Sequence, residues 1–139
     1  MKKEDCIFCK IAAGEIPSTT IYENDEFRVF FDINPASKGH CLIVPKQHYN
    51  DIFDMDEETA GKLFALATKV ARSLKAELNC EGMNIVQNNG TIAGQTVFHF
   101  HLHLIPRYTG DTVKVEWKPG EADIEELQVL AQAVGKNIA

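Results

Sequence analysis

The sequence lacks long apolar runs and has no excess of basic residues. No stretch of its 139 residues approaches the roughly 18 consecutive apolar residues that a membrane-spanning helix needs, so no membrane partner is expected. The 14 lysines and arginines are outnumbered by 20 aspartates and glutamates, and the net charge of −6 argues against non-specific nucleic-acid binding, which needs a basic surface. The N-terminus has charge but no apolar run behind it, so we expect no signal peptide and a cytoplasmic protein.

The chain contains no internal repeat, low-complexity run or linker. A chain of this length can form one domain around one hydrophobic core. In a cytoplasmic protein the four cysteines are expected to be reduced, which favours a metal-binding or catalytic role over a disulfide framework. Cys41 and Cys80 lie among apolar residues and are predicted to be ordinary core residues.

Apolar periodicity and turn residues predict an α+β domain with an antiparallel sheet of about five strands, because the strands follow one another without helical crossovers. The predicted strands are Thr20–Glu23, Phe27–Asp32, His40–Pro45, Met83–Asn88 and a segment from His99 to about Arg107. A further extended segment is predicted at Val113–Trp117.

Helices are predicted from apolar residues that recur at three- and four-residue spacing and form a stripe. The predicted helices are Asp56–Leu78, a short segment from Asp5 to about Ala13, and Ala122–Val134. Either Asp54 or Asp56 is expected to cap the long helix, and Asn79 to end it. Asp5 is expected to cap the short helix, which ends at Gly14.

The segment His99–Ile105 alternates histidine with large apolar residues (His-Phe-His-Leu-His-Leu-Ile). Successive side chains of a β-strand point to opposite faces, so His99, His101 and His103 are expected to share one face. Imidazole can act as nucleophile, proton carrier or metal ligand near neutral pH. The spacing alone leaves open a site for chemistry, a site that only binds metal, and a solvated sheet face.

The pair Cys6 and Cys9 has the spacing of a metal-ligand pair. His48 and His99 could complete a tetrahedral Cys₂His₂ zinc site. A thioredoxin-like redox pair is the alternative, although the βαβ context typical of that motif is missing here.

The histidine motif and five further segments resemble the histidine-triad (HIT) family of nucleotide hydrolases and transferases, in the order of that family. The motif fits His-φ-His-φ-His-φ-φ, in which φ is apolar. The further segments are Cys-Ile-Phe-Cys-Lys-Ile (6–11), Gly-Glu-Ile-Pro (14–17), Phe-Asp-Ile-Asn-Pro (31–35), Gly-His-Cys-Leu-Ile-Val-Pro-Lys (39–46) and Gly-Gln-Thr-Val (94–97).

The resemblance covers residues 5–108, is greatest to the small, Hint-like bacterial branch, and implies a HIT-like fold for this domain. Residues 109–139 carry nothing diagnostic. We expect them to form a C-terminal extension that packs on the same domain through its predicted helix.

The resemblance implies nucleotidyl transfer through a covalent intermediate. His101 matches the nucleophile of the family, which attacks the α-phosphate of a nucleotide and forms a nucleotidyl-histidine that water hydrolyses. The expected substrates are small purine nucleotidyl conjugates such as nucleoside phosphoramidates. The alternatives are a dinucleoside polyphosphate hydrolase or phosphorylase, and a zinc-stabilised nucleotide-binding protein with incidental catalysis.

The resemblance also implies roles for residues around the phosphate, the ribose and the base. His103 and His40 would contact the phosphate, and Thr96 would lie near the leaving group. The nucleotide-binding residues would be Asp32, Asn88, Gln95, Ile7, Phe8, Phe30 and Ile33. Among them Asp32 would accept hydrogen bonds from the ribose hydroxyls, since a carboxylate has two acceptor oxygens. The apolar residues would enclose the base, and Asn88 and Gln95 would lie beside the phosphate.

Similar bacterial proteins hold structural zinc with this cysteine pair and two histidines. The resemblance therefore implies that Cys6, Cys9, His48 and His99 bind a zinc ion that is not the catalyst. No organic cofactor is expected. These proteins are usually homodimers, so a homodimer is expected here too.

Overall fold

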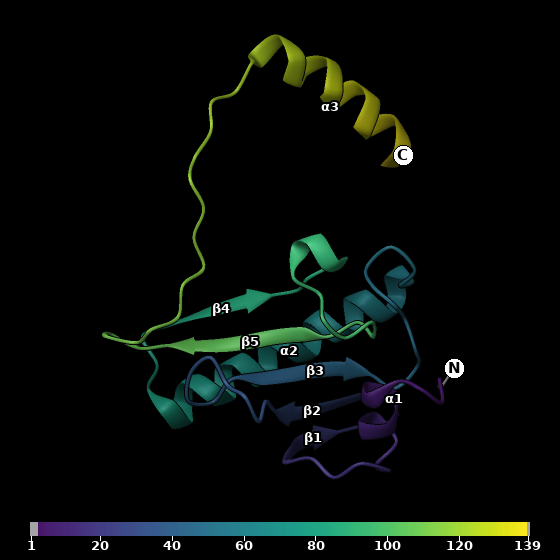
Figure 1. Cartoon of the computed structure of the whole chain (residues 1–139), viewed down its shortest axis with the longest axis vertical. Coiled ribbons are helices and arrows are strands. Elements are labelled where there is room, and N and C mark those ends of the chain that lie inside the picture. Colours follow the sequence, from purple (N-terminus) through teal and green to yellow (C-terminus); the bar gives the residue numbers. More distant parts are fainter. Residues whose placement is uncertain (1–2, 139) are drawn as a thin grey trace.

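Five strands form one antiparallel sheet, which confirms the predicted α+β class (Figure 1). The computed structural model describes residues 3–138. The strands are β1 (Thr20–Glu23), β2 (Phe27–Phe31), β3 (Cys41–Pro45), β4 (Gly82–Val86) and β5 (Leu102–Arg107). Their order across the sheet is β1-β2-β3-β5-β4, so the strand with the last histidine lies inside the sheet.

Helix α2 (Glu57–Leu78) covers one face of the sheet (Figure 1). Its start is fixed as predicted by Asp56, whose carboxylate accepts the Thr59 N–H at 2.9 Å. It ends as predicted at Asn79, which adopts a left-handed conformation. The apolar stripe of α2 packs on inward-facing residues of β2, β3 and β5 and forms the main core. This core contains Phe27, Val29, Cys41, Ile43, Tyr49, Leu63, Ala67, Val70, Leu74, Phe100, Leu102 and Leu104.

Helix α1 (Ile7–Ala12) packs on the opposite face of the sheet, beside β3. The predicted cap was wrong, because Cys6 and not Asp5 precedes the first turn. The Cys6 thiol sulfur accepts the Cys9 N–H at 3.3 Å and so satisfies one of the free donors of the helix start. A second, smaller core lies beneath this helix and contains Ile11, Ala12, Phe30, Leu42 and Val44.

The side chains of the histidine segment alternate between the two faces as predicted, but the strand is shorter than predicted. Only His103 lies in β5, while His99 and His101 precede it in an irregular stretch. The backbone there pairs with the loop after β3, where the Phe100 N–H donates to the Tyr49 carbonyl at 2.7 Å. Phe100 still points into the main core, so the histidines point to the face that carries α1.

The C-terminal arm, defined as residues 112–138, differs most from expectation (Figure 1). Its helix α3 (Ile124–Ile138) forms close to where it was predicted, but Val113–Trp117 is not a strand. The helix does not pack on the domain as expected, because every described residue from 114 onward is exposed. An apolar stripe predicts a helix and does not specify the surface on which the helix packs.

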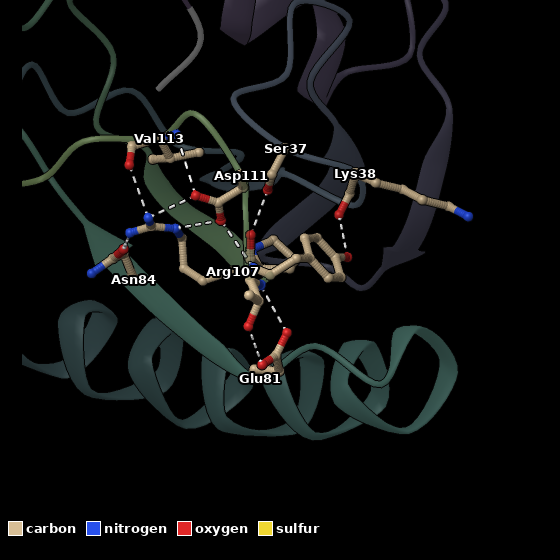
Figure 2. A network of polar contacts seen from close by, with 10 residues as sticks. Ser37, Lys38, Glu81, Asn84, Arg107, Asp111 and Val113 are labelled. Carbon is tan, nitrogen blue, oxygen red and sulfur yellow. Dashed lines mark hydrogen bonds and ion pairs between the residues drawn. The ribbon is translucent and has the colours of Figure 1, made fainter.

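A polar network fixes the base of the arm to the body of the protein (Figure 2). The Arg107 guanidinium donates two hydrogen bonds to the Asp111 carboxylate, both at 2.8 Å, and another to the Val113 carbonyl. Nearby, the Tyr108 hydroxyl donates to the Lys38 carbonyl at 2.7 Å. The chain is therefore held as far as Val113 and extends freely beyond it. No helix among residues 3–138 is long and apolar enough to cross a membrane.

Candidate active site

His101 is held with one ring nitrogen occupied and the other unprotonated. Its Nδ1 lies 2.7 Å from the backbone carbonyl of His99, so Nδ1 carries the proton and donates it. The Nε2 atom therefore keeps its lone pair, which is the form that a nucleophilic imidazole needs. The ring is nearly fully buried, and burial lowers its pKa, so His101 is neutral at pH 7.

His40 and His103 form a chain of hydrogen bonds whose direction is set by the backbone. The Ala36 N–H donates to His40 Nδ1 at 2.9 Å, so the proton of the neutral His40 ring sits on Nε2. That Nε2–H donates to His103 Nδ1 at 2.9 Å. The proton of His103 is consequently on its Nε2 atom. The His103 ring lies beside His101, with ring centroids 4.9 Å apart, and can donate this proton to an oxygen bound there.

Both supporting rings are uncharged at neutral pH. Burial lowers the pKa of His40, and burial with the neighbouring imidazoles lowers the pKa of His103 to about 4. Asp32 lies 3.7 Å from His40 Nε2, and since His40 is neutral this contact is not an ion pair. The Asp32 carboxylate also accepts the Asn34 N–H at 2.8 Å. The rings of His40, His101 and His103 thus converge without a positive charge.

Cys6, Cys9, His48 and His99 bring one potential ligand atom each to within 4.8 Å of one another. The sulfur-to-Nδ1 distances are 3.3 Å for Cys6–His99, 3.3 Å for Cys9–His48 and 3.4 Å for Cys9–His99. Ligand atoms around a tetrahedral zinc ion lie about 3.3–3.8 Å apart, given the usual zinc–sulfur and zinc–nitrogen bond lengths. The donor set and its spacing therefore fit zinc.

The tautomers of these two histidines fit zinc as well. His99 Nε2 donates to the Pro45 carbonyl at 2.8 Å, and His48 Nε2 lies 2.9 Å from the Asn50 side-chain oxygen. Each ring thus carries its proton on Nε2 and directs an unprotonated Nδ1 at the cysteines. Burial lowers the pKa of His99 to about 4, which keeps it neutral and able to bind a metal ion.

Asp32, His40 and His103 form a second compact group, but it is unsuited to metal. With Nδ1 of His40 already accepting the Ala36 N–H, a metal ion on Nε2 would require the ring to lose both protons. Hydrogen-bond direction thus separates the two groups. The first group could hold a metal ion, and the second is arranged to donate hydrogen bonds.

Thr96 lies on the loop before His99, and its side chain is exposed. Together with Ile7 it lines a cavity of about 320 Å³ beside the cysteine and histidine cluster. The neighbouring Gln95 is buried, and its amide bonds to backbone groups of Gly90 and Asn50 at 2.8 and 2.6 Å. Gln95 therefore holds the loop that carries Thr96, and its predicted contact with a nucleotide stays a prediction.

The other predicted nucleotide-binding residues differ in how accessible they are. Asn88 is half-buried, and its side-chain amide makes no hydrogen bond within residues 3–138. This side chain can therefore bind a ligand. Phe8 meets His101 edge-on, with ring centroids 4.9 Å apart, and also contacts Phe30, which is itself buried. Ile33 is largely exposed. The base-binding role assigned to these residues stays a prediction.

Sequence reasoning missed the groups that orient the histidines. The decisive ones are the Ala36 N–H, the carbonyls of Pro45 and His99, and the Asn50 side chain. Only Asn50 leaves a sign in the sequence, as a polar residue two positions after His48. Backbone donors and acceptors are present at every position, so their role depends on the fold.

Comparison with known proteins supports the family resemblance. A model of the HIT domain matches residues 13–110. The chain is 42% identical to Protein hit of Bacillus subtilis, with 98% of this chain and 96% of that protein covered. It is 35% identical to Adenosine 5'-monophosphoramidase of Schizosaccharomyces pombe, with 96% and 98% covered.

Solved structures agree with the fold. A HIT family protein from Bacillus anthracis, 44% identical, superposes with a TM-score of 0.93 over 98% of this chain and 99% of that chain. This superposition includes the C-terminal arm, because a match without it could not cover 98% of the chain. A ZN-bound histidine triad family protein from Mycobacterium smegmatis, 36% identical, superposes with a TM-score of 0.75 over 97% and 98%. The chain thus belongs to the HIT family, as its histidine motif predicted.

Proposed function

We propose that this protein is a nucleotide hydrolase or transferase that acts at an α-phosphate through a nucleotidyl-histidine at His101. The observation that carries the proposal is the tautomer of His101, whose Nδ1 proton is held by a carbonyl while Nε2 stays free to attack. A protein that only bound nucleotides would not need an imidazole prepared in this way.

The reaction is a double displacement. His101 Nε2 forms a bond to the α-phosphorus, and the bond from phosphorus to the leaving group breaks. The leaving group departs with a proton, and we propose the Thr96 hydroxyl as its donor. Water then attacks the same phosphorus and gives up a proton, which restores the Thr96 hydroxyl. The bond to Nε2 breaks, and a nucleoside monophosphate is released. The Nε2–H of His103 stabilises charge on the phosphate oxygens in both steps.

For the substrate we propose a nucleoside phosphoramidate with a purine base. Relatives from Schizosaccharomyces pombe and Candida albicans carry the name adenosine 5'-monophosphoramidase, which supports this class. The ribose would bind Asp32, the phosphate would lie near Asn88, Gln95 and the histidines, and the base would lie against Ile7, Phe8, Phe30 and Ile33. Dinucleoside polyphosphates are the alternative substrate within the same mechanism.

We also propose that Cys6, Cys9, His48 and His99 hold structural zinc. When bound, the ion would join the N-terminal helix to the loop after β3 and to the histidine segment. All four ligand positions come from the protein, so no position is left for substrate, and zinc takes no part in the displacement. The four free cysteines are consistent with a reducing compartment, and we expect a cytoplasmic homodimer.

The test of the reaction uses the purified protein and adenosine 5'-phosphoramidate. We expect steady release of adenylate. In protein quenched during the initial burst, mass spectrometry should find adenylate attached to the peptide that contains His101. His101→Ala should lose at least about 1,000-fold in kcat. Thr96→Ala is the comparison, because it should slow the release of poor leaving groups while leaving the covalent adduct detectable. Turnover in His101→Ala at the native rate would disprove the mechanism.

A further inference from the structure

Helix α3 has an apolar stripe that no part of residues 3–138 covers. The stripe is made of Ile124, Leu127, Leu130, Val134 and Ile138, whose exposed fractions run from 46% to 81%. Spacings of three and four residues place all five on one side of the helix. A short helix rarely persists in water through propensity alone and usually needs packing of its apolar face. The stripe therefore points to a binding surface elsewhere.

A matching surface exists at the edge of the sheet near β1. A groove of about 820 Å³, which we call the β1–α2 groove, runs between β1 and helix α2. Its floor is apolar and includes Ile21, Phe31, Leu66, Val70 and Leu74. Apolar surface that stays open in a single chain commonly marks a site of protein interaction.

The two surfaces lie on opposite sides of one molecule. The arm leaves the body at the end of β5, beside β4, whereas the groove lies at the β1 edge of the sheet. From there the arm runs past β4 and away from the body (Figure 1). The arm of the Bacillus anthracis protein superposes along with the body, so the projecting position recurs in a solved structure.

Length and charge also match. Helix α3 has 15 residues and a length of about 22 Å, and the part of α2 from Lys62 to Leu78 that lines the groove spans about 24 Å. The first turn of α3 contains the acidic residues Glu125 and Glu126, and its last turn contains Lys136. Among the α2 residues that line the groove, Lys62 and Lys69 lie nearer the N-terminus of the helix and Glu77 lies near its C-terminus. Opposite charges therefore meet when the two helices run in the same direction.

We propose that α3 of one molecule binds in the β1–α2 groove of a second copy of this chain. Two copies that exchange arms in this way bury two stripes and two grooves, as in a domain-swapped dimer. Lys69 makes no hydrogen bond or ion pair within residues 3–138 and is placed to meet the acidic start of the arriving helix. The proposal does not depend on the proposed reaction.

The first experiment follows amide hydrogen exchange of the full-length protein at high and low concentration. Amides of α3 should be protected at high concentration and lose this protection on dilution. Leu130→Asp, in the stripe, should remove the protection and weaken self-association by about tenfold or more in sedimentation. Val129→Asp is the matched control, because Val129 is exposed on the other side of α3, and it should behave like the native protein.

The second experiment exchanges charges. Lys69→Glu and Glu126→Lys should each weaken association about two- to fivefold, and the double variant should restore it. Protection of α3 that persists at concentrations where sedimentation finds only monomer would mean that the arm folds back on its own chain. Absence of protection, or equal effects of Leu130→Asp and Val129→Asp, would also overturn the proposal, and failed restoration would overturn the parallel orientation.

Discussion

Replacing His40 by alanine tests the direction of the hydrogen-bond chain in the active site. His40 is almost fully buried and donates from Nε2 to His103 Nδ1 at 2.9 Å. Without this donor the preference of His103 for a proton on Nε2 is lost. Leaving a buried polar atom without its partner costs about 1–3 kcal/mol. We therefore expect kcat/KM to fall by about 5- to 150-fold, because His103 would present the wrong nitrogen to the phosphate.

The assay has two independent readouts. Proton–nitrogen correlation spectra of the histidine rings report which nitrogen of His103 carries the proton, and turnover of a phosphoramidate reports the effect on the reaction. His40→Gln is the matched control, because the amide nitrogen of glutamine can take the place of Nε2 and donate to His103. We expect His40→Gln to keep the Nε2–H form of His103 and most of the activity that His40→Ala loses.

The reasoning would be refuted if His103 kept its Nε2 proton in His40→Ala and kcat/KM changed less than twofold. In that case the Ala36 N–H and the His40 ring would not set the tautomer of His103. A fall in activity without a change in tautomer would also contradict it, since the loss would then come from elsewhere in the site.

Three further predictions concern stability and metal. Gly39→Ala should destabilise the fold by at least about 1–2 kcal/mol in urea unfolding, because Gly39 has a φ of +92° and an added Cβ would collide with Leu78. The folded-state pKa of about 4 for His103 lies below its ordinary 6.5, so the stability it contributes is complete above pH 6.5 and is lost as the pH falls toward 4. After allowance for partial exposure we expect about 1 kcal/mol less stability at pH 5 than at pH 7, and a smaller loss in His103→Gln. Cys9→Ser should lower bound zinc from about one ion per chain to near zero by elemental analysis and lower the Tm, and an unchanged zinc content would contradict the four-residue site.

The regular elements could be predicted because each has its own local signal. The apolar stripe of α2, with Asp56 before it and Asn79 after it, predicted the first residue of the helix to within one position. The strands from β1 to β3 were equally well defined by short apolar runs between turn residues. The shared face of the histidine side chains was predictable too, because side-chain alternation is kept where the strand itself is not.

Features that depend on distant backbone groups could not be predicted. The irregular path of His99 and His101 follows from bonds to Pro45 and Tyr49, which come from another part of the chain. The tautomers of His99 and His103 also follow from distant groups, the Pro45 carbonyl and the His40 ring. The position of α3 was missed for a related reason, since its stripe is the same whether it packs on its own domain or on another molecule.

The neutrality of the buried imidazoles has a consequence for how the protein would respond to its solvent. A phosphate site lined by lysine or arginine attracts its ligand over a distance of many ångströms, and added salt screens that attraction. Here burial holds the pKa values of His40, His101 and His103 below their ordinary range, so attraction begins only when hydrogen bonds form at contact. Nucleotide affinity should therefore stay nearly constant as ionic strength rises, and encounter should proceed at the rate of unassisted diffusion.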